Sequence, residues 1–212
     1  MPGRSIDFGF NYRHTFSFVK LNVGFNGNWT NRSIFQALTP GSIIPPGYPG
    51  AGGALPVSVP RECVGLYSAN CGSPASAGPS STPGSLQPEF TWNQRTTLSF
   101  GDIDFSVLWR HISSLDAEAG TTTFNGTIAR GALAGQVVNF GHIPSYNYFD
   151  LSTRFSIAKH FVLTFTVQNL FNRAPPVVGS TIGSTGFNSG NTYPSTYDTL
   201  GRRFSVGASV KF

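Results

Sequence analysis

Residues 203–212 read Arg203-Phe-Ser-Val-Gly-Ala-Ser-Val-Lys-Phe212 and alternate between apolar and polar or small side chains along their whole length. A helix repeats every 3.6 residues and would scatter these apolar positions around its surface, whereas a strand places them on one face. The sequence therefore predicts a terminal β-strand with one apolar face. The apolar positions are Phe204, Val206, Ala208, Val210 and Phe212.

The same period of two recurs upstream in six further segments. Within each of them, large apolar residues alternate with Asn, Ser, Thr, Gly and isolated charged residues. We therefore expect about seven strands, most of them ten to twelve residues long and one longer. The six segments lie within 6–13, 19–29, 92–100, 103–110, 149–157 and 161–168.

The composition excludes several classes of protein. Charged residues make up 11% of the 212 residues, against roughly 25% in an ordinary soluble domain. Lys, Glu and Met number only 3, 3 and 1, which disfavours long helices, and the 14% of aromatic residues disfavours a disordered chain. The net charge of +5 comes from scattered cations, so we expect no nucleic-acid partner.

The connections between the predicted strands alternate between short and long. Short turns fall near 14–18, 101–102 and 158–160, and long segments cover 34–91, 114–145 and 173–200. Long loops without structure are uncommon in compact soluble domains, whereas transmembrane β-barrels have short turns at one end and long loops at the other. The pattern predicts an antiparallel up-and-down meander with its long loops at one rim.

The first long segment is rich in proline and contains both cysteines. Residues 40–91 hold ten of the fifteen prolines, so we do not expect a central strand there. Cys63 and Cys71 could be free thiols or metal ligands in a reducing compartment. No histidine lies near enough in sequence to complete a zinc site, so a local disulfide in an exported loop is the preferred interpretation.

The central question is whether the apolar faces contact lipid or a second sheet. The opposite faces carry small polar side chains and sparse charges, which suit a watery barrel interior. Large aromatic residues at strand ends suit a membrane interface, although they could also be ordinary core residues. These aromatics are Trp29, Trp92, Trp109, Tyr146, Tyr148, Phe171 and Phe212.

We therefore predict an all-β fold that forms part of a transmembrane β-barrel, with the outer-membrane lipid as a partner. The odd number of strands and the absence of a leading signal segment suggest the C-terminal part of a longer exported chain. The alternative is a soluble β-sandwich that binds a ligand such as a carbohydrate. An enzyme is disfavoured, because the acidic residues are spread singly and no metal or cofactor motif occurs.

Three stretches near the C-terminus resemble TonB-dependent outer-membrane receptors. They are Ser145-Tyr-Asn-Tyr-Phe-Asp-Leu-Ser152, Phe165-Thr-Val-Gln-Asn-Leu-Phe-Asn-Arg-Ala-Pro-Pro176 and Tyr197-Asp-Thr-Leu-Gly-Arg-Arg-Phe-Ser-Val-Gly-Ala-Ser-Val-Lys-Phe212. The family motifs place a set of residues that we expect to be architectural rather than ligand-binding. These are Asn169, Leu170, Phe171, Pro175, Pro176, Tyr197, Asp198, Gly201 and Arg202.

The resemblance implies a function that the segment would share with a whole receptor. Such receptors have 22-stranded barrels with a plugged lumen and lie in the bacterial outer membrane. They import a scarce nutrient, such as a ferric siderophore, cobalamin or an oligosaccharide, with energy from the TonB–ExbB–ExbD complex. Residues 1–212 would supply barrel wall and extracellular loops and would not transport alone, since the TonB box, the plug and about fifteen strands are missing.

The terminal strand has a further implied role. In this family the barrel-assembly machinery recognises a last strand that ends in an aromatic residue, which here is Phe212. Phe204, Val206, Ala208 and Val210 share its face, and an exposed edge of this kind can pair with another sheet. Alternatively, Phe212 only anchors the chain at the membrane interface.

Overall fold

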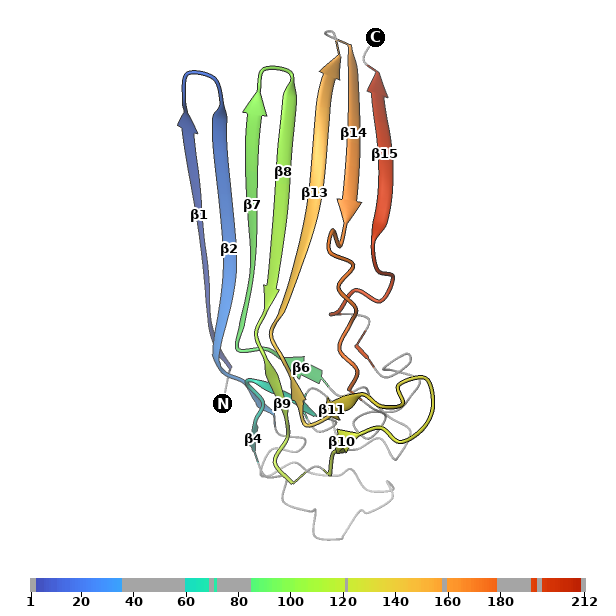
Figure 1. The fold of residues 1–212 in the computed structure, drawn as a ribbon. Helices are drawn as coiled ribbons and strands as arrows, with labels where there is room; N and C mark the ends of the chain where they lie inside the picture. Colours follow the sequence, from blue (N-terminus) through green and yellow to red (C-terminus); the bar gives the residue numbers. More distant parts are fainter. Residues whose placement is uncertain are drawn as a thin grey trace, which may run out of the picture.

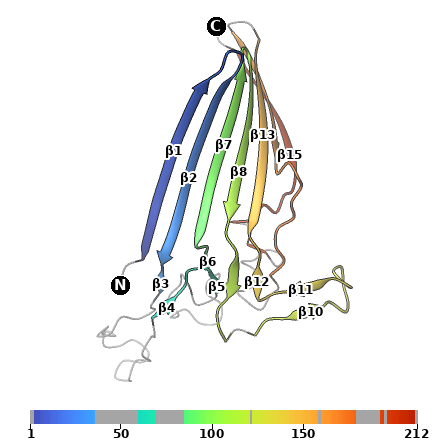
Figure 2. The same cartoon turned by 60° about the vertical axis from the view of Figure 1, so that its left-hand side comes forward.

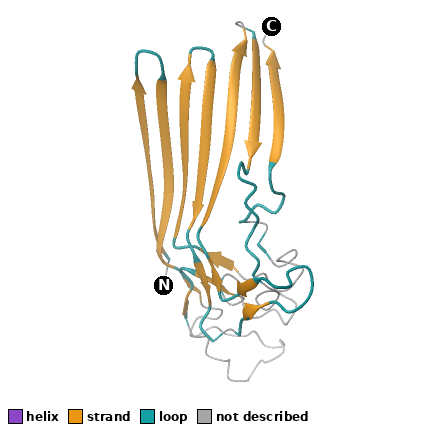
Figure 3. Ribbon diagram, viewed as in Figure 1, coloured by secondary structure: helices purple, strands orange, loops and turns teal. Residues whose placement is uncertain are grey.

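The computed structural model describes residues 3–35, 60–68, 71, 85–120, 122–157, 160–178, 192–193 and 196–210. Within these ranges all regular structure is β, as Figure 3 shows. No described helix is long and apolar enough to cross a membrane.

A seven-stranded antiparallel sheet forms the main body of the fold, and it confirms the predicted meander (Figure 1). Each strand pairs with its neighbours in sequence order when the short strands of the loops are left aside. The sheet does not close on itself, because β1 and β15 are its two edges. The strands are β1 (Arg4–Thr15), β2 (Lys20–Arg32), β7 (Phe90–Phe100), β8 (Ile103–Ile112), β13 (Tyr146–Ile157), β14 (Phe161–Gln168) and β15 (Arg203–Val210).

The tight connections gather at one end of the sheet, and the long loops gather at the other (Figures 1 and 2). Phe16 donates its main-chain N–H to Val19 in the first turn, and Gly101 has a φ of 58° in the second. The third predicted turn falls largely on 158–159, outside the described residues. β14 and β15 have 8 described residues each, and β14 coincides with the predicted segment 161–168.

The register places the predicted apolar residues on a single continuous face. Phe10 lies opposite Phe25, Val107 opposite Leu151, and Phe165 opposite Val206. Directly paired residues point to the same side of a sheet. A shift of the register by one residue would turn the apolar side chains of a strand to the opposite side. The apolar residues of all seven strands lie on the same side.

Short strands occur in the segments that the sequence predicted to be structureless. They are β3 (Ile34–Phe35), β4 (Arg61–Glu62), β5 (Leu66–Ser68), β6 (Ser85–Gln87), β9 (Leu115–Ala117), β10 (Asn125–Thr127), β11 (Val137–Asn139) and β12 (His142–Ile143). In one small sheet, with the order β12-β9-β5-β6, β5 is an inner strand. The expectation that residues 40–91 contain no central strand is therefore wrong, because the three residues of β5 include no proline.

The buried core lies at the loop end and not between two large sheets. It consists of side chains from the three long connections and from the beginning of β13. Its members are Tyr67, Leu115, Ile143, Tyr146, Tyr148, Val178, Tyr193 and Tyr197. The long connections thus form a packed layer at the end of the sheet.

Candidate functional site

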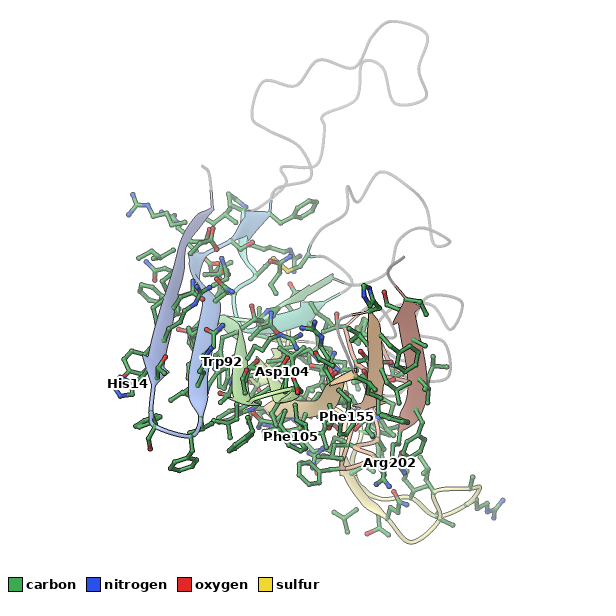
Figure 4. The ribbon with its side chains drawn as sticks, turned by 90° about the horizontal axis from the view of Figure 1, so that it is seen from above. His14, Trp92, Asp104, Phe105, Phe155 and Arg202 are labelled. Carbon is green, nitrogen blue, oxygen red and sulfur yellow. A yellow bond between two sulfur atoms is a disulfide. The ribbon has the colours of Figure 1, made fainter. Side chains whose placement is uncertain are left out.

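The apolar face of the large sheet is open over the described part of the chain. Phe8 is 39% exposed, Phe105 and Phe165 are each 42% exposed, and Val206 is 65% exposed. A β-sandwich would bury these side chains against a second sheet, and none of them belongs to the core. Figure 4 looks along the strands and labels Phe105 and Phe155, which belong to this face.

A continuous row of aromatic rings crosses the apolar face from β1 to the end of β14. Successive ring centroids lie 4.4–5.4 Å apart, which is contact distance for aromatic pairs. The Trp109 indole N–H donates to Asn147 Oδ1 at 2.8 Å, so this ring has both an apolar body and a satisfied polar tip. The row consists of Phe10, Phe25, Trp92, Trp109, Phe149 and Phe171.

Two of the aromatic residues predicted for the membrane interface are instead core residues. Tyr146 is 6% exposed and Tyr148 is 1% exposed, and both belong to the loop-end core. Their side chains lie on the polar face, because Tyr148 pairs with Arg110 across the two strands. The Arg110 guanidinium lies 5.2 Å from the centroid of the Tyr148 ring, which is cation–π distance.

The polar face is held together by hydrogen bonds and ion pairs between neighbouring strands. Asn28 donates to Asp7 at 2.6 Å, and Arg154 lies 3.5 Å from Asp104. Such pairs satisfy polar groups within the face. The face is suited to contact with water.

Shallow cavities run along the polar face. One of them, of about 470 Å³, is lined by Asp7, Asn26, Asn28 and Asn93 among others. An adjoining cavity of about 280 Å³ adds Asn11 and Asn22. Glycine leaves space for the Asn26 side chain here, because a Cβ on Gly9 would lie 2.8 Å from Asn26 Oδ1. The polar side chains of the lining are mainly amides and hydroxyls, and Asp7 and Arg95 are its charged groups.

The loop layer joins all three long connections at one tyrosine cluster. Tyr67 comes from the first connection, Leu115 and Ile143 from the second, and Tyr193 and Tyr197 from the third. The Tyr67 hydroxyl donates to the main-chain oxygen of Phe140. The sequence did not predict this cluster, since tyrosines so far apart in the chain give no periodic signal.

Cys63 and Cys71 form a disulfide in the structure, with the sulfur atoms 2.01 Å apart. Both side chains are 1% exposed. The bridge closes a short loop around β5, so it holds the strand that carries Tyr67 in the core. Its position indicates a structural role for the bridge in the loop layer.

Burial controls the ionisation of the loop tyrosines. It raises the pKa of Tyr193 to about 12, and it raises the pKa of Tyr67 and of Tyr197 still further. All three phenols are therefore neutral at pH 7. They can donate hydrogen bonds but carry no charge to attract a cation.

Asn169, predicted to be architectural, is the residue at which the chain leaves β14. It has a left-handed φ of 51° and is 1% exposed. Its side-chain oxygen accepts from the main-chain N–H of Arg173 at 2.7 Å, and its side-chain nitrogen donates to the carbonyl oxygen of Arg173 at 3.0 Å. Asparagine tolerates this conformation because its short polar side chain bonds locally.

The stretch that starts at Tyr197 returns to the same rim, where β15 begins. The Arg202 main-chain N–H donates to Asn172 Oδ1 at 3.0 Å, and Arg203 Nη1 lies 2.9 Å from Asp198 Oδ1. The arginine paired with Asp198 in the structure is thus Arg203, on the polar face, and Arg202 is exposed. The structure thus brings this stretch and residues 169–176 together at one rim.

The other motif residues lie around this rim in different environments. Phe171 is 69% exposed and ends the aromatic row. Pro176 is buried, whereas Leu170 and Pro175 are half-buried.

The terminal strand exposes its apolar face at the edge of the sheet. Phe204 is 73% exposed and Val210 is 52% exposed, and Ala208 lies between them opposite Leu163. Phe212, proposed as the aromatic end of the assembly signal, lies outside the described residues. No group of three metal-ligating side chains occurs among the residues that are described.

A seven-stranded antiparallel sheet with one apolar and one polar face has the architecture of a section of transmembrane barrel wall. A scan against models of protein families finds no match to this sequence. A search of the curated proteins also finds no match.

Solved structures with a similar course of the chain are ferric enterobactin receptors of Pseudomonas aeruginosa. One point mutant is 15% identical, with a TM-score of 0.42, and the match covers 98% of this chain and 31% of the receptor. A second mutant, in complex with enterobactin, is also 15% identical, with a TM-score of 0.42 and coverages of 99% and 31%. The chain thus spans about a third of the length of these receptors.

Proposed function

We propose that residues 1–212 form the C-terminal part of the barrel of a TonB-dependent outer-membrane receptor. One observation carries the proposal: the apolar face of seven strands is exposed, while the buried core lies in the loops. A hydrocarbon environment makes such a face stable, whereas in water the face would drive association. Residues 169–176 and the stretch that starts at Tyr197 both resemble receptor motifs, and their meeting at one rim supports the same interpretation.

In this function the segment forms structural parts of the receptor and does not itself drive transport. The apolar face contacts lipid, the polar face lines part of the lumen, and the tyrosine-centred loop layer forms part of the outer entrance. A scarce nutrient, such as a ferric siderophore, cobalamin or an oligosaccharide, would pass the polar face. Transport would require TonB–ExbB–ExbD acting on a plug that these residues do not include.

The terminal strand supports a proposed contact with the barrel-assembly machinery. β15 pairs only with β14 among the described strands, and its apolar face is open. An edge of this kind can add to another sheet through main-chain hydrogen bonds. Phe204, Val206, Ala208, Val210 and Phe212 would form the signal.

Detergent dependence tests the proposed environment. We expect the purified full chain to remain monodisperse only in detergent micelles or lipid, because exposed apolar area drives association in water. A chain that is monodisperse and folded without detergent would contradict the proposal and would favour a soluble binding module. Receptor activity is a separate test: an intact receptor carrying this segment should import its nutrient only in cells with a functional TonB complex.

A further inference from the structure

Two polar side chains interrupt the apolar face of the sheet close to its loop end. His111 of β8 lies directly opposite Asn147 of β13 and opposite Trp92 of β7, near the ends of these strands that meet the long loops (Figure 1). Together with Trp109 they form a half-buried group, here called the rim patch. Polar groups facing hydrocarbon are costly unless they are hydrogen-bonded, so the rim patch is suited to a polar contact at the membrane boundary.

A hydrogen-bond network fixes the chemistry of the rim patch. Asn147 Oδ1 accepts from the Trp109 indole N–H at 2.8 Å and lies 2.9 Å from His111 Nδ1. An amide oxygen only accepts, so Nδ1 carries the proton and Nε2 of the neutral ring is an acceptor. The Asn147 amide nitrogen remains as a donor. The network therefore sets a donor and an acceptor on neighbouring strands.

Both of these nitrogen atoms are accessible and are bordered by aromatic rings. Within the described part of the chain, no hydrogen bond uses His111 Nε2 or the Asn147 amide nitrogen, and neither atom is buried. The Trp92 ring centroid lies 5.2 Å from that of His111 and 4.4 Å from that of Trp109. A ligand of the rim patch would thus meet one donor, one acceptor and apolar ring atoms.

This combination suits a sugar better than a phosphate. Sugar hydroxyl groups both donate and accept hydrogen bonds, and the C–H groups of a sugar ring can contact aromatic rings. A phosphate would need a cation, but Arg95, Arg110 and Arg154, the arginines of β7, β8 and β13, lie on the polar face. The charged side chain that bonds an indole at this end of the sheet is acidic, because Glu89 accepts from Trp29 at 3.3 Å.

The apolar face continues directly from the rim patch towards the tight turns. Val107 and Phe105 follow Trp109 along the same face of β8 and are 37% and 42% exposed. An amphiphile with its headgroup at the rim patch would therefore lay its acyl chains over these residues. We propose that the rim patch binds the sugar headgroup of a membrane glycolipid. This inference rests on the proposed function, which places the apolar face in lipid.

Binding of defined lipids to the full chain tests the proposal. Micelles of an amine-oxide detergent are used, because a glycoside detergent would itself supply sugars. The probes are glucosyl diacylglycerol and phosphatidic acid with the same acyl chains, and titration of tryptophan fluorescence measures both affinities. We expect about tenfold tighter binding of the glucosyl lipid, since the two hydrogen bonds are made to its sugar. Equal affinities, or tighter binding of phosphatidic acid, would overturn the proposal.

A variant and a matched control separate binding from folding. Asn147→Asp keeps an acceptor for Trp109 and His111 but loses the donor, so we expect the affinity for the glucosyl lipid to fall about tenfold. Thr153→Val changes a polar residue on the same face of β13, opposite Phe105, and should leave that affinity unchanged. Equal effects of the two substitutions would overturn the proposal.

NMR of the wild-type chain gives an answer even if the aspartate variant does not fold. We expect the His111 Nε2 resonance to shift on addition of glucosyl diacylglycerol and to stay unchanged with methyl glucoside, which has no acyl chains. No shift with the lipid, or equal shifts with both, would overturn the proposal. A chain that is folded and monodisperse without detergent contradicts the proposed function, whereas a detergent-dependent chain without preference for the glucosyl lipid overturns only the role of the rim patch.

Discussion

The main-chain N–H of Asn169 donates to Asp150 Oδ1 at 2.8 Å, at the point where β14 ends beside β13. The same carboxylate oxygen lies 3.3 Å from Arg110 Nη2 on β8. One acidic side chain therefore connects three neighbouring strands at the loop end of the sheet. This connection fixes the place where the chain leaves the sheet to enter its third long loop.

Asn169→Ala should destabilise this end of the sheet. The change removes both side-chain hydrogen bonds to Arg173 and leaves alanine at a φ of 51°. We expect the free energy of unfolding to fall by about 2–3 kcal/mol, as measured by urea titration in micelles. Asn169→Gly keeps the conformation accessible and should lose less. An alanine variant as stable as the wild type would contradict this role.

Gly201 and Gly207 offer a matched pair of substitutions near and within the terminal strand. A Cβ on Gly201 would lie 2.9 Å from Asn172 Oδ1 at a φ of 72°, whereas a Cβ on Gly207 meets nothing within 4 Å. We expect Gly201→Ala to lower the unfolding free energy by about 1–2 kcal/mol and Gly207→Ala to have little effect. Urea titration of both variants measures the difference, and equal losses would contradict the assigned constraint.

Reduction of the disulfide should loosen the loop layer more than the large sheet. The bridge between Cys63 and Cys71 closes a loop with a sequence separation of 8, for which the chain-entropy model gives about 2–3 kcal/mol. In a variant with both cysteines changed to serine, we expect faster amide exchange at β5 and β9. Exchange in β7 and β8 should stay unchanged, and uniform acceleration throughout would show that the bridge supports the whole fold.

Alkaline pH should destabilise the loop layer through Tyr193. Its pKa is raised by burial from 10.0 to about 12, so the folded chain holds the proton more tightly than the unfolded chain. The contribution of this pKa difference to the folding stability is fully present below pH 10 and is lost as the pH rises towards 12. The thermal midpoint should fall over this range, with a smaller fall for Tyr193→Phe. A midpoint independent of pH would rule out this contribution.

The main sheet could be predicted from the sequence because each strand carries its own signal. The alternation of Phe161, Leu163, Phe165 and Val167 specifies both the strand and its apolar face, without information from elsewhere in the chain. The end of β14 agrees with the predicted segment 161–168, and Asn169 follows it in a left-handed conformation.

The loop layer was not predictable in the same way. Tyr67 meets Tyr193 across more than a hundred residues, and nothing near either tyrosine in sequence indicates the contact. Tyr148 was assigned to the membrane interface because it stands at a strand end, yet it packs inward on the polar face. Its position depends on which loop covers the strand, and that is tertiary information. Strands as short as β5 are likewise set by their neighbours and not by local propensity.

Accessibility along one strand tests the central claim most directly. Single cysteines at Phe165 and Val167, and at Thr164 and Thr166, can carry spin labels in the full chain in lipid bilayers, since the native cysteines are paired in the disulfide. We predict that labels at 165 and 167 respond to dissolved oxygen and that labels at 164 and 166 respond to a water-soluble nickel complex. The opposite assignment, or four labels with the same response, would contradict a sheet with one face in lipid and the other in water.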